Sequence, residues 1–222
     1  MCYNYFTTKA KGAIKAMKSI ITISREFGSG GKEIGMKLAE KLGVPFYDKK
    51  LLEEAAKQSG ICEDLFHKHD ETYTSSLLYS LVMGAYPVSS DGKLYPDMPL
   101  NHKIFLAQFD AIKSIAEKGP CVIIGRCADY VLADNYKTVD FFIFGDMPEK
   151  KKRILERYDI EKTKVEDFIK KTDKRRASYY NYYSDRKWGV ATHYDLCVNS
   201  SELGIDKTVD LLYNYVMLYE QE

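Results

Sequence analysis

Residues 19–43 read SIITISREFGSGGKEIGMKLAEKLG, and this stretch decides the fold. It opens with a short isoleucine-rich run at 20–23, which predicts a buried strand. Next come the glycines that allow the backbone to curl into a turn: Gly28, Gly30 and Gly31. The apolar residues beyond the turn predict the buried face of a helix: Ile34, Met36, Leu38, Ala39 and Leu42. The stretch therefore predicts a strand, a glycine-rich turn and a helix in direct succession.

A turn of this kind is suited to hold phosphate. Successive backbone N–H groups can point inward where no side chains crowd them, and the positive end of the following helix adds to the attraction for an anion. A turn with a purely structural role is the alternative. The residues that we expect to bind a phosphate-bearing ligand are Gly28, Ser29, Gly30, Gly31, Lys32 and Glu33.

The P-loop pattern GxxxxGK[ST] matches the turn in part. Gly31 and Lys32 supply the GK pair, whereas Glu26 stands at the position of the first glycine and Glu33 at that of the hydroxyl residue. An alignment that keeps GSG in place instead puts Gly31 at the lysine position and Lys32 at the hydroxyl position. Each alignment lacks one contact that the pattern normally supplies. The first makes Lys32 the cation that reaches the phosphates.

Length and composition narrow the class of protein. The 222 residues suit one α/β domain with a mobile subdomain, and the net charge of +1 gives no global attraction to nucleic acid or anionic lipid. No apolar run approaches the roughly 18 residues that cross a bilayer. The five cysteines form no CxxC pair and fit small buried hydrophobes. We expect a soluble cytoplasmic protein without nucleic-acid or membrane partners.

Further strands alternate with helical patterns along the chain, which predicts a parallel sheet covered on both faces. A last helix is predicted to open at Asp206. The additional strands are expected at 44–48, 121–124, 139–144 and 193–199.

Polar residues follow two of these strands at their carboxyl ends, where ligands bind in open α/β sheets. Asp48 ends the strand at 44–48, and Arg126 and Asp129 come directly after the strand at 121–124. Arg126 and Asp129 could form only a surface ion pair, which contributes little to stability. Their position at the strand end favours ligand binding.

The region 51–119 is mostly helical in pattern and ends with a helix at 101–118 that carries Gln108, a further candidate for substrate binding. It is either a helical subdomain that covers one sheet edge or a lid-like domain that shuts out water around a substrate.

Basic residues concentrate in a second helical region, 162–188. A basic helix can bind nucleic acid, but a lid that brings cations over phosphate groups fits the neutral remainder of the chain better. Lys174, Arg175 and Arg176 are the best candidates for this role. On the helix before it, Arg153 and Arg157 are four residues apart and form either part of a solvated face or a pair directed at a nucleotide.

Taken together, several segments of the chain resemble the cytidylate kinase-like family of P-loop kinases. The resemblance runs from about residue 18 to about residue 212. Its segments, in chain order, are ITISREFGSGGKEIG, KLGVPFYDKKLLEEAA, CVIIGRCAD, DKRRASYYNYY, WG and YDLCVNSSELGI.

The resemblance implies an α/β P-loop kinase fold of three layers, αβα, with a five-stranded parallel sheet. It also implies a helical acceptor-binding insertion and a lid. Residues 1–17 would then be an N-terminal extension and 18–222 the kinase domain, with 51–119 as the acceptor-binding region and 162–188 as the lid.

The activity implied is transfer of the γ-phosphoryl group of ATP, with Mg²⁺, to a nucleoside monophosphate or a similar small-molecule acceptor. The alternative is a nucleotide-binding regulatory protein that keeps the fold without turnover. No residue is assigned as a metal ligand, and a homodimer is left open. The candidate catalytic residues are Lys32, Arg126, Arg175 and Arg176, and the candidate substrate-binding residues are Asp48, Gln108, Arg126, Asp129 and Lys174.

Overall fold

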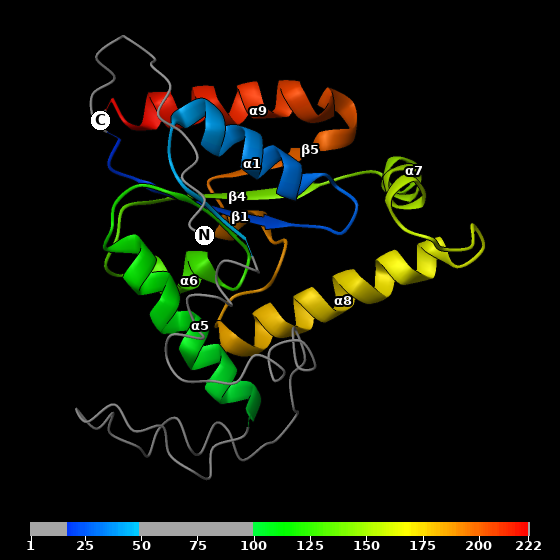
Figure 1. The fold of residues 1–222 in the computed structure, drawn as a ribbon, viewed down its shortest axis with the longest axis horizontal. Coiled ribbons are helices and arrows are strands. Elements are labelled where there is room, and N and C mark those ends of the chain that lie inside the picture. The colour runs from blue at the N-terminus through cyan, green and yellow to red at the C-terminus, as the bar shows by residue number, and fades with distance from the viewer. Residues whose placement is uncertain (1–16, 49–99, 222) are drawn as a thin grey trace, which may run out of the picture.

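The fold is a parallel β-sheet between layers of helices, described by a computed structural model for residues 17–48 and 100–221 (Figure 1). The sheet has five strands in the order β2-β3-β1-β4-β5, and every neighbouring pair is parallel. This confirms the predicted fold class. The strands are β1 (Ile20–Arg25), β2 (Phe46–Tyr47), β3 (Val122–Ile124), β4 (Thr138–Phe144) and β5 (Leu196–Asn199).

Helices cover both faces of the sheet (Figure 1). On one face lie α1 (Gly31–Leu42) and α9 (Ser200–Tyr219), and on the other lie α5 (Leu100–Ala116) and α6 (Ala128–Leu132). Two further helices, α7 (Met147–Arg157) and α8 (Val165–Tyr183), follow β4 and pack against each other near the carboxyl ends of the strands. None of the helices in the described ranges combines the length and the apolar character that a bilayer crossing requires.

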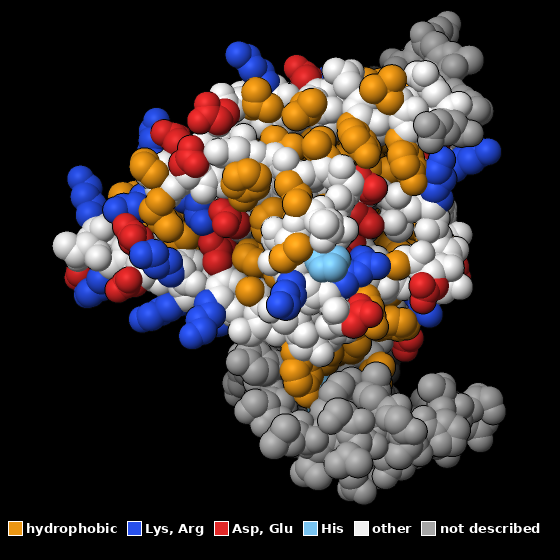
Figure 2. Space-filling model, turned by 180° about the vertical axis from the view of Figure 1, so that it is seen from behind, with side chains coloured by type: hydrophobic (Ala, Val, Ile, Leu, Met, Phe, Trp, Pro, Cys, Tyr) orange, Lys and Arg blue, Asp and Glu red, His pale blue; other side chains and the backbone are white. Residues whose placement is uncertain are grey.

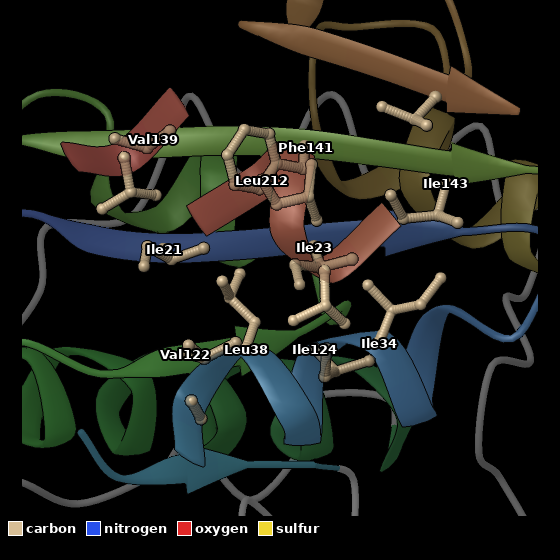
Figure 3. Close-up of a cluster of buried hydrophobic side chains, with 14 residues drawn as sticks. Ile21, Ile23, Ile34, Leu38, Val122, Ile124, Val139, Phe141, Ile143 and Leu212 are labelled. Atoms are coloured by element: carbon tan, nitrogen blue, oxygen red, sulfur yellow. The ribbon is translucent and has the colours of Figure 1, made fainter. Parts of the chain in front are cut away.

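Alternation along the strands divides the core into two clusters, because successive side chains of a strand point to opposite faces. Ile21 and Ile23 of β1 pack toward α1 and α9, where Figure 3 shows them beside Leu38. Ile20 of β1 belongs to the cluster on the α5 and α6 side. Met36, which we expected on the buried face of α1, is 50% exposed, since it lies two residues from Ile34 and Leu38 and so on another side of the helix.

Several predicted element boundaries differ from the structure, and of the strand expected at 193–199 only Leu196–Asn199 forms β5. β2 is shorter than the predicted 44–48 segment. The last helix begins six residues before Asp206, because Asn199 caps it by accepting a hydrogen bond from the Ser201 amide at 3.0 Å. Gly204, at φ 71°, interrupts this helix, so the pattern after it looked like a separate start. The predicted helices within 49–99 lie outside the described residues.

A half-buried carboxylate, that of Asp140, joins β1 to β4. The hydroxyl of Thr22 donates to Asp140 Oδ1 at 2.6 Å, and the hydroxyl of Thr138 donates to Oδ2 at 3.1 Å. Burial raises the pKa of Asp140 to about 6, although the bond from Thr22 acts in the opposite direction. The sheet therefore contains a carboxyl group that keeps its proton up to about pH 6.

This preference predicts a specific pH dependence of stability. The ordinary pKa is 3.8, so the native state binds the proton of Asp140 more tightly than the unfolded state does, and the associated stability falls as the pH rises through about 6. Relative to Asp140→Asn, we expect the wild type to lose about 1 kcal/mol of unfolding free energy between roughly pH 5 and 7. Urea denaturation at both pH values measures this difference.

Asp134→Asn, a change at an exposed carboxylate, serves as the control and should keep the pH dependence of the wild type. Identical pH profiles for the wild type and Asp140→Asn would contradict the assignment.

Candidate active site

The loop between β1 and α1 is shaped by glycines in left-handed conformations. Gly28 has φ 83° and Gly30 has φ 80°. A Cβ atom on Gly30 would lie only 2.4 Å from the side chain of Ile205, so the loop also needs glycine for its close packing on α9. Gly30 caps α1 without a side-chain hydrogen bond, and the Gly31 amide makes only a long bond of 3.4 Å to Ser29 Oγ, so the start of the helix can accommodate an anion.

A buried ionic cluster anchors this loop to α7 and α8. Lys150 of α7 is 4% exposed, and its Nζ lies 2.9 Å from Glu26 Oε2 and 2.9 Å from Asp173 Oδ2. Glu26 also accepts from the Gly145 amide at 3.2 Å, and Asp173 accepts from the Phe27 amide at 2.6 Å. Burial raises the pKa of Asp173, and its bonds to Phe27 and Lys150 oppose that shift. Glu26, at the expected place of the first P-loop glycine, is thus the residue that fastens the loop.

Two arginines of α7 face the loop and the start of α1. Arg153 Nη1 donates to the Gly28 carbonyl at 3.2 Å. Arg157 Nη2 donates to Glu33 Oε2 at 2.6 Å, and this bond lowers the pKa of Glu33. Arg153 is partly buried against the loop, whereas the side chain of Arg157 is 56% exposed, so the structure leaves the solvated-face interpretation of Arg157 open.

Lys32 and Asp48 form an ion pair between α1 and the end of β2. Lys32 Nζ lies 2.6 Å from Asp48 Oδ2, and the lysine side chain is 65% exposed while that of Asp48 is 14% exposed. The structure thus brings together two residues that the sequence assigned to different parts of the site.

A cavity lies at the carboxyl ends of β1 and β3, as expected for a ligand site in this class of sheet. It measures about 20 Å³, which is room for about one water molecule. No acidic side chain is among its described lining residues. These are Ser24, Arg25, Gly125, Arg126, Cys127, Arg176, Tyr179, Tyr180 and Trp188.

The turn after β3 holds one wall of the cavity in an unusual backbone conformation. Gly125, Arg126 and Cys127 have φ values of 71°, 59° and 56°. Left-handed conformations cost free energy at residues other than glycine and are found disproportionately at functional sites. The turn places Arg126 in the cavity wall, where it is 6% exposed and its guanidinium lies 5.8 Å from the centre of the Tyr179 ring.

Asp129 and Gln108 lie behind the cavity. Asp129 is 2% exposed and accepts a short hydrogen bond from the Tyr180 hydroxyl. Burial raises the pKa of Asp129, against the effects of Tyr180 and of Arg186, whose Nη1 lies 3.8 Å away. Gln108 accepts from the Tyr179 hydroxyl at 3.0 Å. Both residues, predicted to bind substrate, contact the tyrosines that line the cavity.

The three basic candidates of α8 point in different directions. Arg176 lines the cavity, donates to the Arg25 carbonyl at 3.0 Å and lies 5.4 Å from the centre of the Phe27 ring. Arg175 and Lys174 are exposed, and Arg175 donates to Thr172 at 3.3 Å on its own helix. Among these candidates the structure brings only Arg176 to the cavity.

Sequence reasoning missed Arg25, Lys150 and Trp188. Arg25 follows the predicted isoleucine strand directly, and its place at a strand end was a usable signal. Lys150 stands in the run Lys150 to Lys152, which looks like a solvated helical face, and nothing in the pattern distinguishes the one buried lysine.

Solved structures of other proteins share this fold. The chain is similar to shikimate kinases from Bacteroides thetaiotaomicron (TM-score 0.52, 16% identity, 89% of this chain and 98% of that chain covered) and from Acinetobacter baumannii, the latter in complex with shikimate (TM-score 0.52, 10% identity, 94% and 97% covered). With its parallel sheet and its glycine loop before α1, the chain has the fold of a P-loop kinase.

The chain belongs to the cytidylate kinase-like family, whose model matches residues 20–202. It is also similar to an uncharacterized protein from Eubacterium ventriosum ATCC 27560, with 32% identity, a TM-score of 0.67 and 90% of this chain and 98% of that chain covered. A search of curated proteins finds no match. The protein is thus a small-molecule kinase, and P-loop kinases of this kind use ATP and Mg²⁺.

The ionic cluster around Lys150 predicts a large effect on stability. Lys150→Ala would leave Glu26 and Asp173 close together without their shared cation, and we expect a loss of about 3 kcal/mol of unfolding free energy. Lys152→Ala, on the exposed side of the same helix, should change stability by less than about 0.5 kcal/mol. Denaturant unfolding of both variants tests this, and equal stabilities would contradict the structural role.

Proposed function

We propose that the protein transfers the γ-phosphoryl group of ATP to a nucleoside monophosphate. The observation that carries the proposal is the cavity beside the glycine loop, which combines arginine side chains with aromatic rings. Arginine suits a phosphate group because its planar fork can bind two oxygens at once, and aromatic rings offer faces against which a base can stack.

The loop and α7 form the ATP side of the proposed site. The amides at the start of α1 and the backbone of Gly28 to Gly31 would hold the β- and γ-phosphates. Arg153, which donates to the Gly28 carbonyl, lies at the edge of this proposed phosphate-binding site. Catalysis of this reaction consists of positioning and charge neutralisation, so it needs no protein nucleophile.

The acceptor side would be formed by the cavity. Arg126 and Arg176 would bind the acceptor phosphate, and Tyr179 and Trp188 would lie near its base. The cavity of about 20 Å³ is far smaller than the several hundred Å³ of typical ligand pockets, so α8 must move outward before the acceptor enters. We therefore propose that the region 162–188 acts as a lid, fastened by Asp173 and Arg176 in its closed position.

Within the described residues, no cluster of side chains is suited to hold a metal ion such as Mg²⁺. Mg²⁺ is usually bound by one or two carboxylates together with the phosphates of the substrate. The carboxylates of Glu26, Glu33, Asp48 and Asp173, around the loop and the end of β2, each pair with a basic side chain. We therefore assign no residue to the metal and derive no step through it.

A panel of acceptors tests the proposal. Wild-type protein with ATP and Mg²⁺ is incubated separately with CMP, UMP, AMP, GMP and shikimate, and products are identified by phosphorus NMR. We expect a nucleoside diphosphate from at least one monophosphate and no product from shikimate, which has no phosphate for the arginines to bind. Tight ATP binding without transfer to any acceptor would instead favour the regulatory alternative.

The acceptor role of Arg126 predicts a selective kinetic defect. Arg126→Gln removes a buried cation from the acceptor phosphate, and we expect the KM for the monophosphate to rise about 100-fold while the KM for ATP changes little. Lys171→Gln, a neutralised and exposed cation on α8, should behave like the wild type. Steady-state kinetics with each substrate varied in turn measures this, and an equal rise in both KM values would count against the assignment.

A further inference from the structure

We propose that Arg25, rather than Lys32, is the residue that contacts the transferred phosphoryl group, the role that the P-loop pattern gives to its lysine. This inference rests on the proposed function, since it concerns the same reaction. It follows from where α1 begins, from what surrounds the side chain of Arg25 and from the charge of the cavity.

The start of α1 favours the alignment that places Gly31 at the lysine position. Gly30 is the cap of the helix and Gly31 its first residue, so the first side-chain position after the loop belongs to a glycine. The side chain of Lys32 begins one residue later and ends at Asp48, at the end of β2, with 65% of its surface exposed. In this position the Lys32 ammonium lies at the β2 edge and is not part of the cavity wall.

The side chain of Arg25 occupies the space that a residue with a side chain would fill at position 31. A Cβ atom added to Gly31 would lie 2.6 Å from Cβ and 3.0 Å from Cγ of Arg25. Further along the same side chain, a Cβ atom added to Gly125 would lie 2.1 Å from Nη1 and 3.1 Å from Cζ of Arg25. Two glycines from different elements thus flank one arginine, whose guanidinium lies beside the turn that follows β3.

The cavity wall adds an electrostatic argument. Arg25, Arg126 and Arg176 all line it, and no carboxylate does so among the residues that the structure describes. The buried acid behind it, Asp129, is engaged by Tyr180. Guanidinium groups keep their charge at all physiological pH values, so this wall favours a multiply charged anion.

A phosphoryl group in transfer is such an anion. The oxygen of the acceptor phosphate forms a bond to the γ-phosphorus while the bond from that phosphorus to the oxygen of ADP breaks, and negative charge spreads over the remaining oxygens. Donors fixed in place before the reaction stabilise this charge most effectively. Between the glycine loop and Arg126, the guanidinium of Arg25 is placed to donate to those oxygens.

Two substitutions at Arg25 and one at Lys32 test the proposal. Arg25→Gln keeps a side chain of similar length without the charge, and we expect kcat to fall about 1,000-fold with the acceptor KM changed less than about threefold. Arg25→Lys should recover about tenfold of that loss, because lysine restores the positive charge but not the planar guanidinium that can bind two oxygens at once. Lys32→Gln should lower kcat less than Arg25→Gln. Thermal unfolding checks that each variant is folded.

The control is Lys41→Gln, which removes a cation of α1 that pairs with Asp210 far from the loop and should leave activity unchanged. Chemical rescue separates a contact with the reacting group from a structural role. In Arg25→Ala, free guanidinium below the concentration that unfolds the protein should restore part of the activity, whereas it should not stimulate Lys32→Ala. Loss of kcat in Lys32→Gln with near wild-type kcat in Arg25→Gln would overturn the proposal.

The failure of the proposed function would be visible separately, as the absence of transfer by the wild type. In that case the role of Arg25 is tested by measuring nucleotide binding with calorimetry. Arg25→Gln should weaken the binding of ATP at least tenfold more than that of ADP, because only ATP carries the γ-phosphate. Equal effects on ATP and ADP would refute the inference.

Discussion

The burial of Lys150 between Glu26 and Asp173 is the interaction on which the site depends. It joins the glycine loop to α7 and α8, although Lys150 lies 124 residues from Glu26 in the sequence, and so connects the proposed ATP side to the proposed lid. A buried ammonium is tolerated only with charged partners, so the three elements must adopt one mutual arrangement for the cluster to form. The fixed loop then presents the start of α1, and the fixed α8 brings Arg176 to the cavity wall.

The second constraint is the turn after β3. Its left-handed residues, including Arg126, place a guanidinium in the wall of the cavity, while Gly125 leaves space for the side chain of Arg25. Tyr180 and its partner Asp129 support this wall from behind. Away from the cavity, basic and acidic side chains are interspersed over the face opposite to the view of Figure 1, as Figure 2 shows. The concentration of positive charge therefore belongs to the lining of the cavity and not to that broad surface.

The hydrophobic pattern predicted most of the fold correctly. The apolar run of β3 is a strand buried on both faces, as a central parallel strand usually is, whereas β1 and β4 bury an apolar face and pair Thr22 with Asp140 on the other. The site was harder to predict. Arg126 follows a strand end and was found by that rule, whereas Lys150 looks like its solvated neighbours and only its partners from other elements distinguish it. Asp129 was expected to bind substrate, but its burial against Tyr180 depends on how α8 packs.

The sequence by itself determined the strand, turn and helix around the glycines, the order of strands and helices, and the resemblance to a kinase family, because these depend on local periodicity and on motifs read along the chain. Only the tertiary structure decided which basic side chains lie together in the site. Arg25, Arg126 and Arg176 come from three separate elements and line one cavity, while Lys32 is drawn to Asp48 at the neighbouring strand. Long basic side chains can reach in many directions, and the direction each takes is set by burial and by partners that the linear sequence does not show.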